Sequence, residues 1–175
     1  MRDSSDKIIE FTLVYNQHKS KLFNYALKMI GDRMSCEDII QNVFVKFFEN
    51  LELIQNSNSI NFWLFKTTRN EIFSYFRKKK THPDQFKVED TDELEIDSKF
   101  RIEEELEHKE LNEIIRAELD KMAIEQRDVF LLKEYGGLSY KEIALVMSID
   151  ENLVKSRLFK VRNRLIDKLS KCINL

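Results

Sequence analysis

The stretch Leu138–Leu169 constrains the fold most, because it encodes two helices separated by a corner of only three residues. Ser139 and Glu142 have the spacing of a capping box, in which each side chain bonds the other residue's backbone N–H and starts a helix. Two glycines at 136–137 precede the box and permit a sharp chain reversal. Residues 148–150 end the short helix, and the aspartate among them can cap the next one. The pattern predicts a helix-turn-helix.

The second of these helices carries distinct side chains around its circumference at about 100° per residue. One narrow sector is apolar and comprises Val154, Leu158, Val161 and Leu165. The opposite sector is mixed and comprises Asn152, Lys155, Ser156, Phe159, Lys160 and Asn163. Basic residues flank both sectors, namely Arg157, Arg162, Arg164 and Lys168. This arrangement suits a helix that packs by its apolar stripe, contacts phosphates by its flanks and meets base edges by its far face. A solvated basic surface helix has a similar pattern and is the alternative.

Composition indicates an all-α protein, because 175 residues include only three Gly and one Pro. The two cysteines, Cys36 and Cys172, are isolated, so they predict no disulfide framework and favour a reducing compartment. The N-terminus is polar and charged, and no apolar run is long enough to cross a membrane. We therefore expect a cytoplasmic protein with no direct membrane insertion.

Charge divides the chain into three parts, although the net charge is only −2. Residues 1–80 hold 13 Lys/Arg against 9 Asp/Glu, residues 81–122 hold 6 against 15, and residues 123–175 hold 10 against 7. Binding to nucleic acid responds to local patches rather than to the total charge. The predicted organisation is a helical domain at 6–80, an acidic flexible linker at 81–105 and a helix-turn-helix domain at 106–173.

The first domain is predicted to contain three helices. Apolar residues recur at helical spacing over Asp6–Ile30 and again over Ser35–Asn50, where Ser35 and Asp38 form a second expected capping box. Residues 51–60 are rich in Ser and Asn and are predicted to form a loop. The third helix begins at Asn61 and ends in a basic run at 77–80 that suits phosphates. Its interleaved aromatic residues suit stacking on single-stranded bases, but packing in a small core explains most of them better.

Two sets of residues resemble one known family. Cys36–Phe44, followed by Trp63–Asn70 and Arg77, is similar to region 2 of a bacterial RNA polymerase sigma factor. Residues 119–165 resemble region 4 of the same family, and there is no room for a region 3 between them. This layout is that of the extracytoplasmic-function (ECF, group 4) class. The resemblance implies a two-domain factor that binds core polymerase, recognises −35 and −10 promoter elements and aids promoter opening.

The resemblance also implies contacts residue by residue. On the helix with the Glu-Asp-x-x-Gln motif, Asp38 and Gln41 match contacts to the coiled coil of the polymerase beta-prime clamp. Asn42 is expected to join them, although the family usually has an acidic residue there. The segment Leu119–Tyr135 would meet the polymerase beta flap. These contacts make core RNA polymerase the expected protein partner.

The remaining matched positions face DNA in the family. Those expected to bind the −10 element in melted DNA are Asn70, Ser74, Arg77 and Lys78, with a pocket for a flipped base in the loop at 53–61. Those expected at the double-stranded −35 element are Asn152, Lys155, Ser156, Arg157, Phe159, Lys160 and Arg162. One departure lies in the helix-turn-helix corner, where Ser148 stands in place of a common Gly. Many members of the class also have a cognate anti-sigma factor, which is a further expected partner.

Two other functions remain as alternatives. A stand-alone transcriptional regulator would share the helix-turn-helix, but it would carry a receiver or ligand-binding domain upstream, and the first 80 residues show no such pattern. An enzyme is the weakest alternative. His18, His82 and His108 lie in different segments without metal-ligand spacing, and no nucleophile motif or phosphate-binding glycine loop is present. We therefore predict no catalytic residues, no metal and no cofactor.

Overall fold

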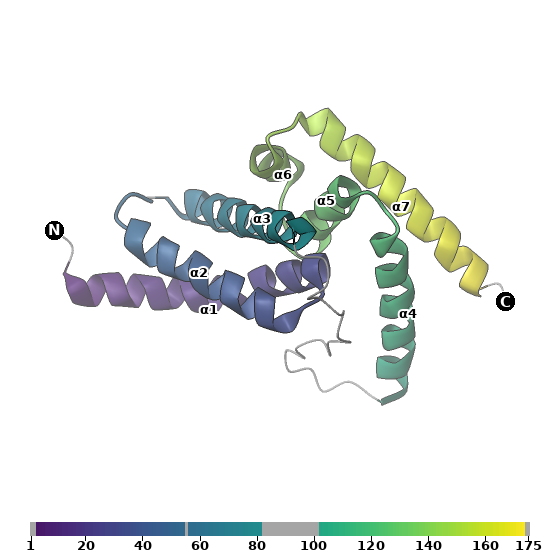
Figure 1. Cartoon of the computed structure of the whole chain (residues 1–175), viewed down its shortest axis with the longest axis horizontal. Helices are drawn as coiled ribbons and strands as arrows, with labels where there is room; N and C mark the ends of the chain where they lie inside the picture. Colours follow the sequence, from purple (N-terminus) through teal and green to yellow (C-terminus); the bar gives the residue numbers. More distant parts are fainter. Residues whose placement is uncertain (1–2, 55, 82–101, 174–175) are drawn as a thin grey trace.

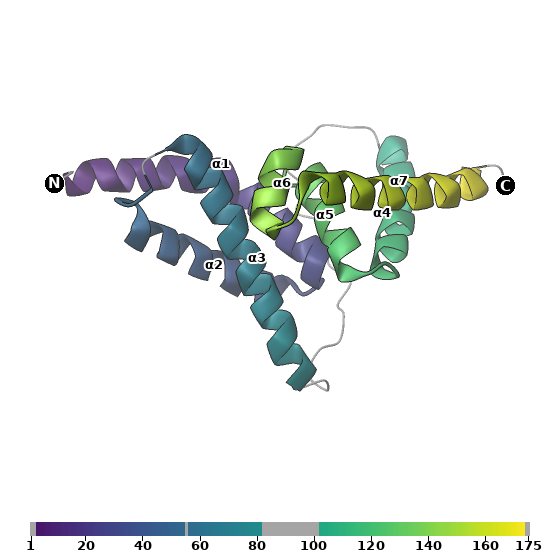
Figure 2. The same cartoon turned by 90° about the horizontal axis from the view of Figure 1, so that it is seen from above.

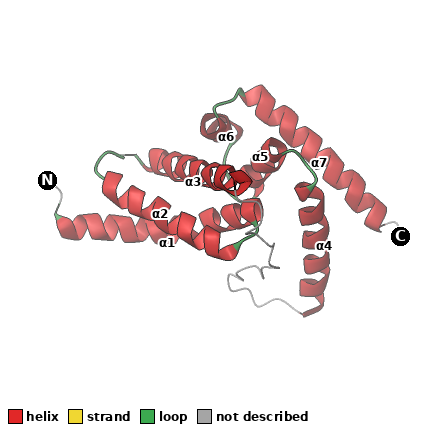
Figure 3. Cartoon of the chain, viewed as in Figure 1, coloured by secondary structure: helices red, strands yellow, loops and turns green. Residues whose placement is uncertain are grey.

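The computed structural model describes residues 3–54, 56–81 and 102–173, and the regular secondary structure within them is all α-helical (Figure 1). Seven α-helices and no strand occur in these ranges, as Figure 3 shows, which confirms the predicted all-α class. The acidic linker predicted at 81–105 falls mostly outside the described residues. Among the residues that are described, no helix has both the length and the apolar character needed to span a bilayer.

The helices form an N-terminal and a C-terminal module. The N-terminal module contains α1 (Ser4–Ile30), α2 (Arg33–Asn50) and α3 (Ser57–Thr81). The C-terminal module contains α4 (Ile102–Asp120), α5 (Ile124–Glu134), α6 (Tyr140–Met147) and α7 (Glu151–Ile173). Figure 2 shows α3 crossing α1 and α2 in the first module, whereas α7 starts beside α6 and runs over α5 and α4 towards the C-terminus.

The capping box predicted at Ser35 and Asp38 is wrong. The start of α2 lies two residues earlier, and Asp32 is its N-cap, accepting a hydrogen bond from the Met34 backbone N–H at 3.2 Å. Ser35 instead lies inside the first turn, where its hydroxyl donates to the other carboxylate oxygen of Asp32. Asp32 caps the helix in place of Ser35 because aspartate caps as well as serine does, and its carboxylate also complements the positive end of the helix dipole.

The third helix begins earlier than its composition indicated. It starts at Ser57 instead of Asn61, so the predicted loop at 51–60 is shortened. Asn56 supports this start, because its side-chain oxygen accepts from the Asn58 backbone N–H at 3.0 Å. Ser and Asn disfavour helix interiors but are well suited to a helix start. Residues 57–60 are therefore a capped first helical turn rather than part of a loop.

Aromatic side chains form the core of the N-terminal module, where α1, α2 and α3 pack together. The Phe11 ring lies 5.3–6.2 Å from four other rings on α1 and α2. Phe47 also approaches Trp63 of α3, with the ring centroids 5.9 Å apart. These contacts favour the core interpretation of the aromatic residues over base stacking. On α3 itself, Phe65 and Ile72 are fully buried, whereas Phe62 and Phe76 are only partly buried.

The helix-turn-helix has the predicted caps. Ser139 Oγ accepts from the Glu142 backbone N–H at 3.1 Å, and Glu142 Oε2 accepts from the Ser139 backbone N–H at 2.7 Å. Asp150 Oδ1 accepts from the Asn152 backbone N–H at 3.0 Å and caps α7. In the corner, Ser148 has a φ of 55° and a ψ of 46°. The family's usual glycine would adopt this left-handed conformation without strain, and serine adopts it here at a cost of about 1–2 kcal/mol.

The two glycines before the motif have different roles. Gly137 adopts a φ of +67° in open space, so its role is conformational. Gly136 allows a close approach, since a Cβ there would lie 2.6 Å from the Leu132 carbonyl oxygen and 3.0 Å from Cε1 of Phe65. We expect Gly136→Ala to lower the free energy of unfolding by about 1–3 kcal/mol, the range for overpacking. Thermal melts would measure this loss. An unchanged melting temperature would show that the backbone and Phe65 move aside for the added methyl group without loss of stability.

The two cysteines differ sharply in expected reactivity. Cys36 is buried in the first module, and burial raises the pKa of its thiol to about 12, helped by Asp32 and Glu37. Cys172 is exposed near the end of α7. Because the thiolate is the reactive form, we expect one thiol per folded chain to react with a thiol reagent at pH 8, and two after denaturation. Prompt reaction of both in the folded chain would contradict the burial of Cys36.

Candidate nucleic-acid and polymerase interface

The face of α7 opposite its buried stripe is open to solvent. Val154, Leu158, Val161 and Leu165 are all buried against the module, as the helical periodicity predicted. The far-face residues Asn152, Lys155, Ser156, Phe159 and Lys160 are all exposed. Exposure makes these five side chains available to a ligand, and their assignment to the −35 element stays a prediction.

Some of the basic side chains on α7 already make contacts within the C-terminal module. Arg157 and Arg162 are half-buried. Arg162 Nη2 donates to Glu134 Oε1 at 3.0 Å, and this bond raises the pKa of the guanidinium. Lys155 lies 3.8 Å from Glu151 and 5.9 Å from the centre of the Tyr140 ring. Such pairs at an exposed surface contribute little stability, so phosphate oxygens could replace these partners at small cost.

Phe159 is the most unusual side chain on this face. It is 66% exposed in the middle of a basic surface, where a phenyl ring gains nothing from water. A ring at this position can pack against the methyl group that thymine presents in the major groove. Apolar contact of this kind discriminates between bases, whereas the lysines beside it supply mainly charge.

A second candidate surface follows one face of α3. Asn70, Ser74, Arg77 and Lys78 lie at spacings of four, seven and eight residues, which places them on one side of a helix. Asn70, Arg77 and Lys78 are exposed, and Ser74 is half-buried. The basic residues lie in the last turns, where α3 leaves the bundle of the first module (Figure 2). An exposed, basic helix end of this kind can bind along the phosphate backbone of a nucleic acid.

A third surface lies on α2. Asp38, Gln41 and Asn42 are exposed and share one helix face, and the apolar Val45 continues that face at 57% exposure. The mixture of acid, amides and an exposed valine differs from the two basic surfaces. It is suited to a protein partner better than to nucleic acid.

The two modules meet at a buried polar cluster that the sequence did not reveal. Asp128 of α5 is 0% exposed. Its Oδ1 accepts from the hydroxyl of Tyr25 on α1 at 2.6 Å, and its Oδ2 accepts from Nε of Arg69 on α3 at 2.7 Å. Burial raises the pKa of the Asp128 carboxyl, and the positive charge of Arg69 opposes this effect. Burial likewise raises the pKa of the Tyr25 hydroxyl well above its ordinary value.

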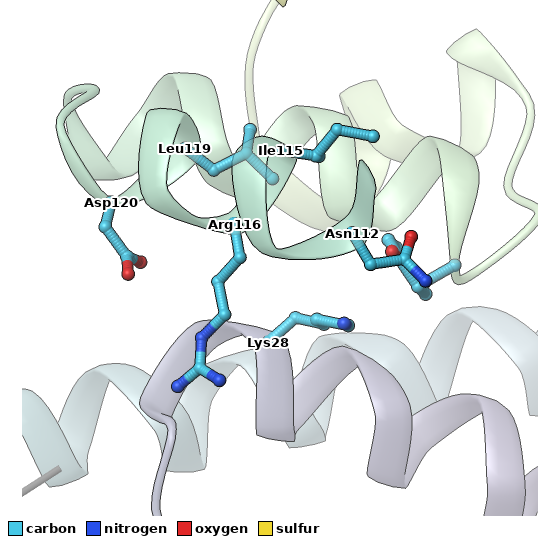
Figure 4. A pocket seen from close by; sticks show the side chains of 7 residues that line it. Lys28, Asn112, Ile115, Arg116, Leu119 and Asp120 are labelled. Atoms are coloured by element: carbon cyan, nitrogen blue, oxygen red, sulfur yellow. The ribbon is translucent and has the colours of Figure 1, made fainter. Parts of the chain in front are cut away.

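Nothing in the described part of the chain indicates a metal centre, because no three His, Cys, Asp or Glu side chains there are grouped to hold an ion. The hollow shown in Figure 4 lies between α1 and α4 and has space of about 10 Å³, roughly one water molecule. Its lining comprises Lys28, Asn112, Ile115, Arg116, Leu119, Asp120 and Tyr135. It is too small for an organic ligand.

The fold and these surfaces define a class: a two-module helical protein with a helix-turn-helix in its second module. Comparisons with known proteins agree. The family profile described as Sigma-70 region 2 matches residues 14–82, and the profile described as Sigma-70, region 4 matches residues 112–165. The chain is 27% identical to the ECF RNA polymerase sigma factor SigX of Bacillus subtilis, over 83% of this chain and 76% of that protein. It is also 27% identical to SigM of the same organism, over 87% of this chain and 90% of the relative.

Solved structures show the same fold. The sigma factor RpoE in complex with the anti-sigma factor NepR from Bartonella quintana matches with a TM-score of 0.70 at 21% identity, over 94% of this chain and 97% of that one. CnrH in complex with the cytosolic domain of CnrY matches with a TM-score of 0.63 at 20% identity, over 92% and 88% of the two chains. This chain belongs to the sigma-70 family, as an ECF-class sigma factor whose function is promoter-specific initiation of transcription.

Proposed function

We propose that the two modules of this sigma factor divide promoter recognition between them while both are bound to core RNA polymerase. The C-terminal module (residues 106–173) recognises the −35 element as duplex DNA. The N-terminal module (residues 6–80) recognises the −10 element and holds it as it melts. The polymerase carries out the chemistry, so the sigma factor itself is not an enzyme. We place this activity in the cytoplasm, where the polymerase and the chromosome are found.

The single observation that carries the −35 assignment is the exposed far face of α7. Lys155 and Lys160 supply donors for base edges or phosphates, Ser156 supplies a hydroxyl, and Phe159 supplies an apolar surface for a thymine methyl. Asn152 lies at the start of this face and Arg157 and Arg162 flank it, and all three would contact the DNA backbone. The order of a capped short helix, a three-residue corner and a longer helix matches proteins that insert the second helix in the major groove.

The −10 assignment rests on the aligned face of α3. Asn70 and Ser74 can donate to or accept from exposed base edges, and Arg77 and Lys78 can bind phosphates of a separated strand. The segment predicted to capture a base, 53–61, therefore includes the first turn of α3, because the helix begins at Ser57.

Polymerase contact is assigned to two surfaces. Asp38, Gln41 and Asn42 on α2 would bind the coiled coil of the beta-prime clamp, with Val45 as an apolar contact among them. The segment Leu119–Tyr135, which covers the end of α4 and the whole of α5, would meet the beta flap. A cognate anti-sigma factor is a further proposed partner, since both solved structures of similar fold contain a second protein, named in one of them as an anti-sigma factor.

The test is transcription in vitro with purified core polymerase and a library of promoter sequences. We expect the sigma factor to select promoters with defined −35 and −10 elements, and core polymerase alone to select none. Lys160→Ala should weaken selection at the −35 element by about 1–3 kcal/mol, or roughly 5- to 150-fold, without changing the melting temperature. The matched control is Lys171→Ala, which removes an exposed lysine in the last turn of α7, about three turns beyond Lys160.

The outcomes separate the parts of this proposal. Loss of polymerase affinity in Lys160→Ala, with −35 preference unchanged, would show that the wrong face of α7 has been assigned. Retention of −10 preference in a chain with Asn70→Ala and Arg77→Ala would remove α3 from DNA recognition. Failure of the unmodified chain to alter start-site choice would refute the proposal that the two modules recognise the −35 and −10 elements.

A further inference from the structure

We propose that Tyr140 is a positioning residue for −35 recognition, because its ring holds the ammonium group of Lys155 in place on the DNA-facing side of α7. The proposal rests on the proposed function of α7, whereas the contact between the ring and the ammonium belongs to the free chain and can be measured there. Tyr140 lies on α6 and is not among the residues assigned to DNA. Its effect on DNA is exerted through Lys155.

The Tyr140 ring has a fixed place in the C-terminal module. Tyr140 is the first residue of α6, and the capping box of Ser139 and Glu142 sets the backbone of this turn. The ring is partly buried and packs against the hydrophobic core. On the α5 side, Lys133 Nζ lies 4.9 Å from the ring centroid and donates to the Leu138 carbonyl oxygen at 3.2 Å. A tyrosine has only two side-chain torsions, so these contacts leave its ring little freedom.

Lys155 is held from two sides at the start of α7, the part of that helix that lies beside α6 (Figure 2). Its Nζ lies 5.9 Å from the centroid of the Tyr140 ring, within the reach of about 6 Å that a cation–π contact has. The same atom lies 3.8 Å from Oε1 of Glu151, one turn earlier on the helix. Both partners draw the lysine towards the N-terminal end of α7, which a helix-turn-helix presents to base edges.

The two lysines assigned to DNA differ in this respect. Lys160 is exposed, and within the described ranges it makes no ion pair and no ring contact. Its flexible four-carbon stem is therefore free to rotate until DNA binds. Lys155 has a similar stem and is also exposed, at 54% of its side-chain surface, but its ammonium already has a place. The Tyr140 ring should consequently affect Lys155 and leave Lys160 unchanged.

The hydroxyl of Tyr140 has a separate contact. Arg162 donates to Glu134 at 3.0 Å, and this bond, together with a further one to the Tyr140 hydroxyl, raises the pKa of the Arg162 guanidinium. Because Glu134 keeps Arg162 in position without the hydroxyl, loss of the hydroxyl alone should have little effect. The face of the ring is the part of Tyr140 that matters for Lys155.

A restrained lysine loses less freedom on binding. Immobilising one flexible side chain at an interface costs a factor of about 2 to 10 in affinity. A lysine that the ring has already placed avoids much of this factor, and a lysine without the ring does not. We therefore expect removal of the ring to weaken discrimination at the −35 element about 2- to 10-fold.

The experiment uses the chain bound to core polymerase, with a promoter selected from the library and the same promoter with an altered −35 element. Tyr140→Leu removes the ring face and should lower the ratio of transcription from the two promoters about 2- to 10-fold. Tyr140→Phe retains the face and should stay within about twofold of the unmodified chain, because Lys155 keeps its partner. Each variant is assayed well below its melting temperature.

A double-mutant cycle separates positioning from direct contact with DNA. In a Lys155→Ala background, Tyr140→Leu should cause no further loss, because the ring then has no lysine to place. In the matched Lys160→Ala background, Tyr140→Leu should cause its full loss. An equal loss in both backgrounds would overturn the proposal, since Tyr140 would then act on DNA without Lys155. An unchanged ratio in Tyr140→Leu, or an equal loss in Tyr140→Phe, would overturn it as well.

A change in the electronic character of the ring covers the case in which Tyr140→Leu does not fold. Pentafluorophenylalanine in place of Tyr140 keeps nearly the same shape and reverses the ring quadrupole that attracts a cation. Compared with Tyr140→Phe, it should show the same 2- to 10-fold loss of discrimination. Equal discrimination in these two chains would show that the ring does not hold Lys155 by its face.

Nuclear magnetic resonance of the free chain tests the contact without polymerase or DNA. The methylene protons of Lys155 next to its ammonium group should be shifted by the ring current of Tyr140, and Tyr140→Leu should abolish the shift. No shift in the unmodified chain would overturn the contact itself. If the shift is present but the unmodified chain shows no −35 preference with polymerase, the proposed function of α7 has failed instead.

Discussion

Replacing Phe47 by alanine is expected to lower the free energy of unfolding by about 3–5 kcal/mol. Phe47 is 0% exposed on α2 and lies between Phe11 of α1 and Trp63 of α3, with ring centroids 6.2 Å and 5.9 Å away. Truncation removes the side chain that joins all three helices and leaves a cavity that rigid aromatic neighbours cannot fill. Urea unfolding followed by circular dichroism would measure the loss.

The neighbouring residue provides a matched control. Phe48 has the same side chain on the same helix but is 39% exposed, and its ring contacts the edge of Phe11 at 5.3 Å with Lys7 above it. We expect Phe48→Ala to cost about 1 kcal/mol or less, because its site opens to solvent. Equal losses in the two variants would mean that the aromatic cluster is loosely packed and could be used for stacking on bases.

Much of this fold follows from local sequence pattern. The buried stripe of α7 and its exposed far face follow from periodicity alone, because a helix that packs on one side must repeat apolar residues every three to four positions. The capping box at Ser139 and Glu142 was predictable for a similar reason, since the two side chains satisfy each other within four residues. The site residues on α2 and α3 were selected by the resemblance to the sigma-factor family rather than by periodicity alone.

Helix starts were predicted less well where two caps compete. Asp32 and Ser35 are both good N-caps three residues apart, and the capping-box spacing of Ser35 and Asp38 favoured the wrong one. The start of α3 was missed for the opposite reason. A polar run of Ser and Asn resembles a loop, yet Asn56 caps a helix whose first turn carries a single apolar residue, the buried Ile60.

The module interface could not be predicted from the sequence. Asp128 lies in an amphipathic helix, where an acidic residue usually faces water, and its partners are far away in the chain. Tyr25 and Arg69 likewise resemble an ordinary core tyrosine and an ordinary surface arginine. Only the three-dimensional arrangement shows that the three side chains satisfy one another. The same holds for Gly136, whose lack of a side chain accommodates a phenyl ring of the other module.

In the second module, Leu158→Ala is expected to lower the free energy of unfolding by about 2–5 kcal/mol. Leu158 is 1% exposed and lies in the middle of the stripe by which α7 packs on α5 and α6. Its loss would open a cavity beneath the DNA-facing surface, so −35 binding should weaken as the folded fraction falls. Thermal melts and duplex binding at a temperature well below the melting point would separate the two effects.

Phe159 is the matched control, because it adjoins Leu158 in sequence but faces solvent. Phe159→Ala should change stability by less than about 0.5 kcal/mol, since little of its surface is buried. At the same time it should relax the preference for thymine at one −35 position by about 1 kcal/mol, because the ring would no longer contact the methyl group. A large loss of stability in Phe159→Ala, or none in Leu158→Ala, would reverse the assignment of the two faces of α7 and with it the position of DNA on this helix.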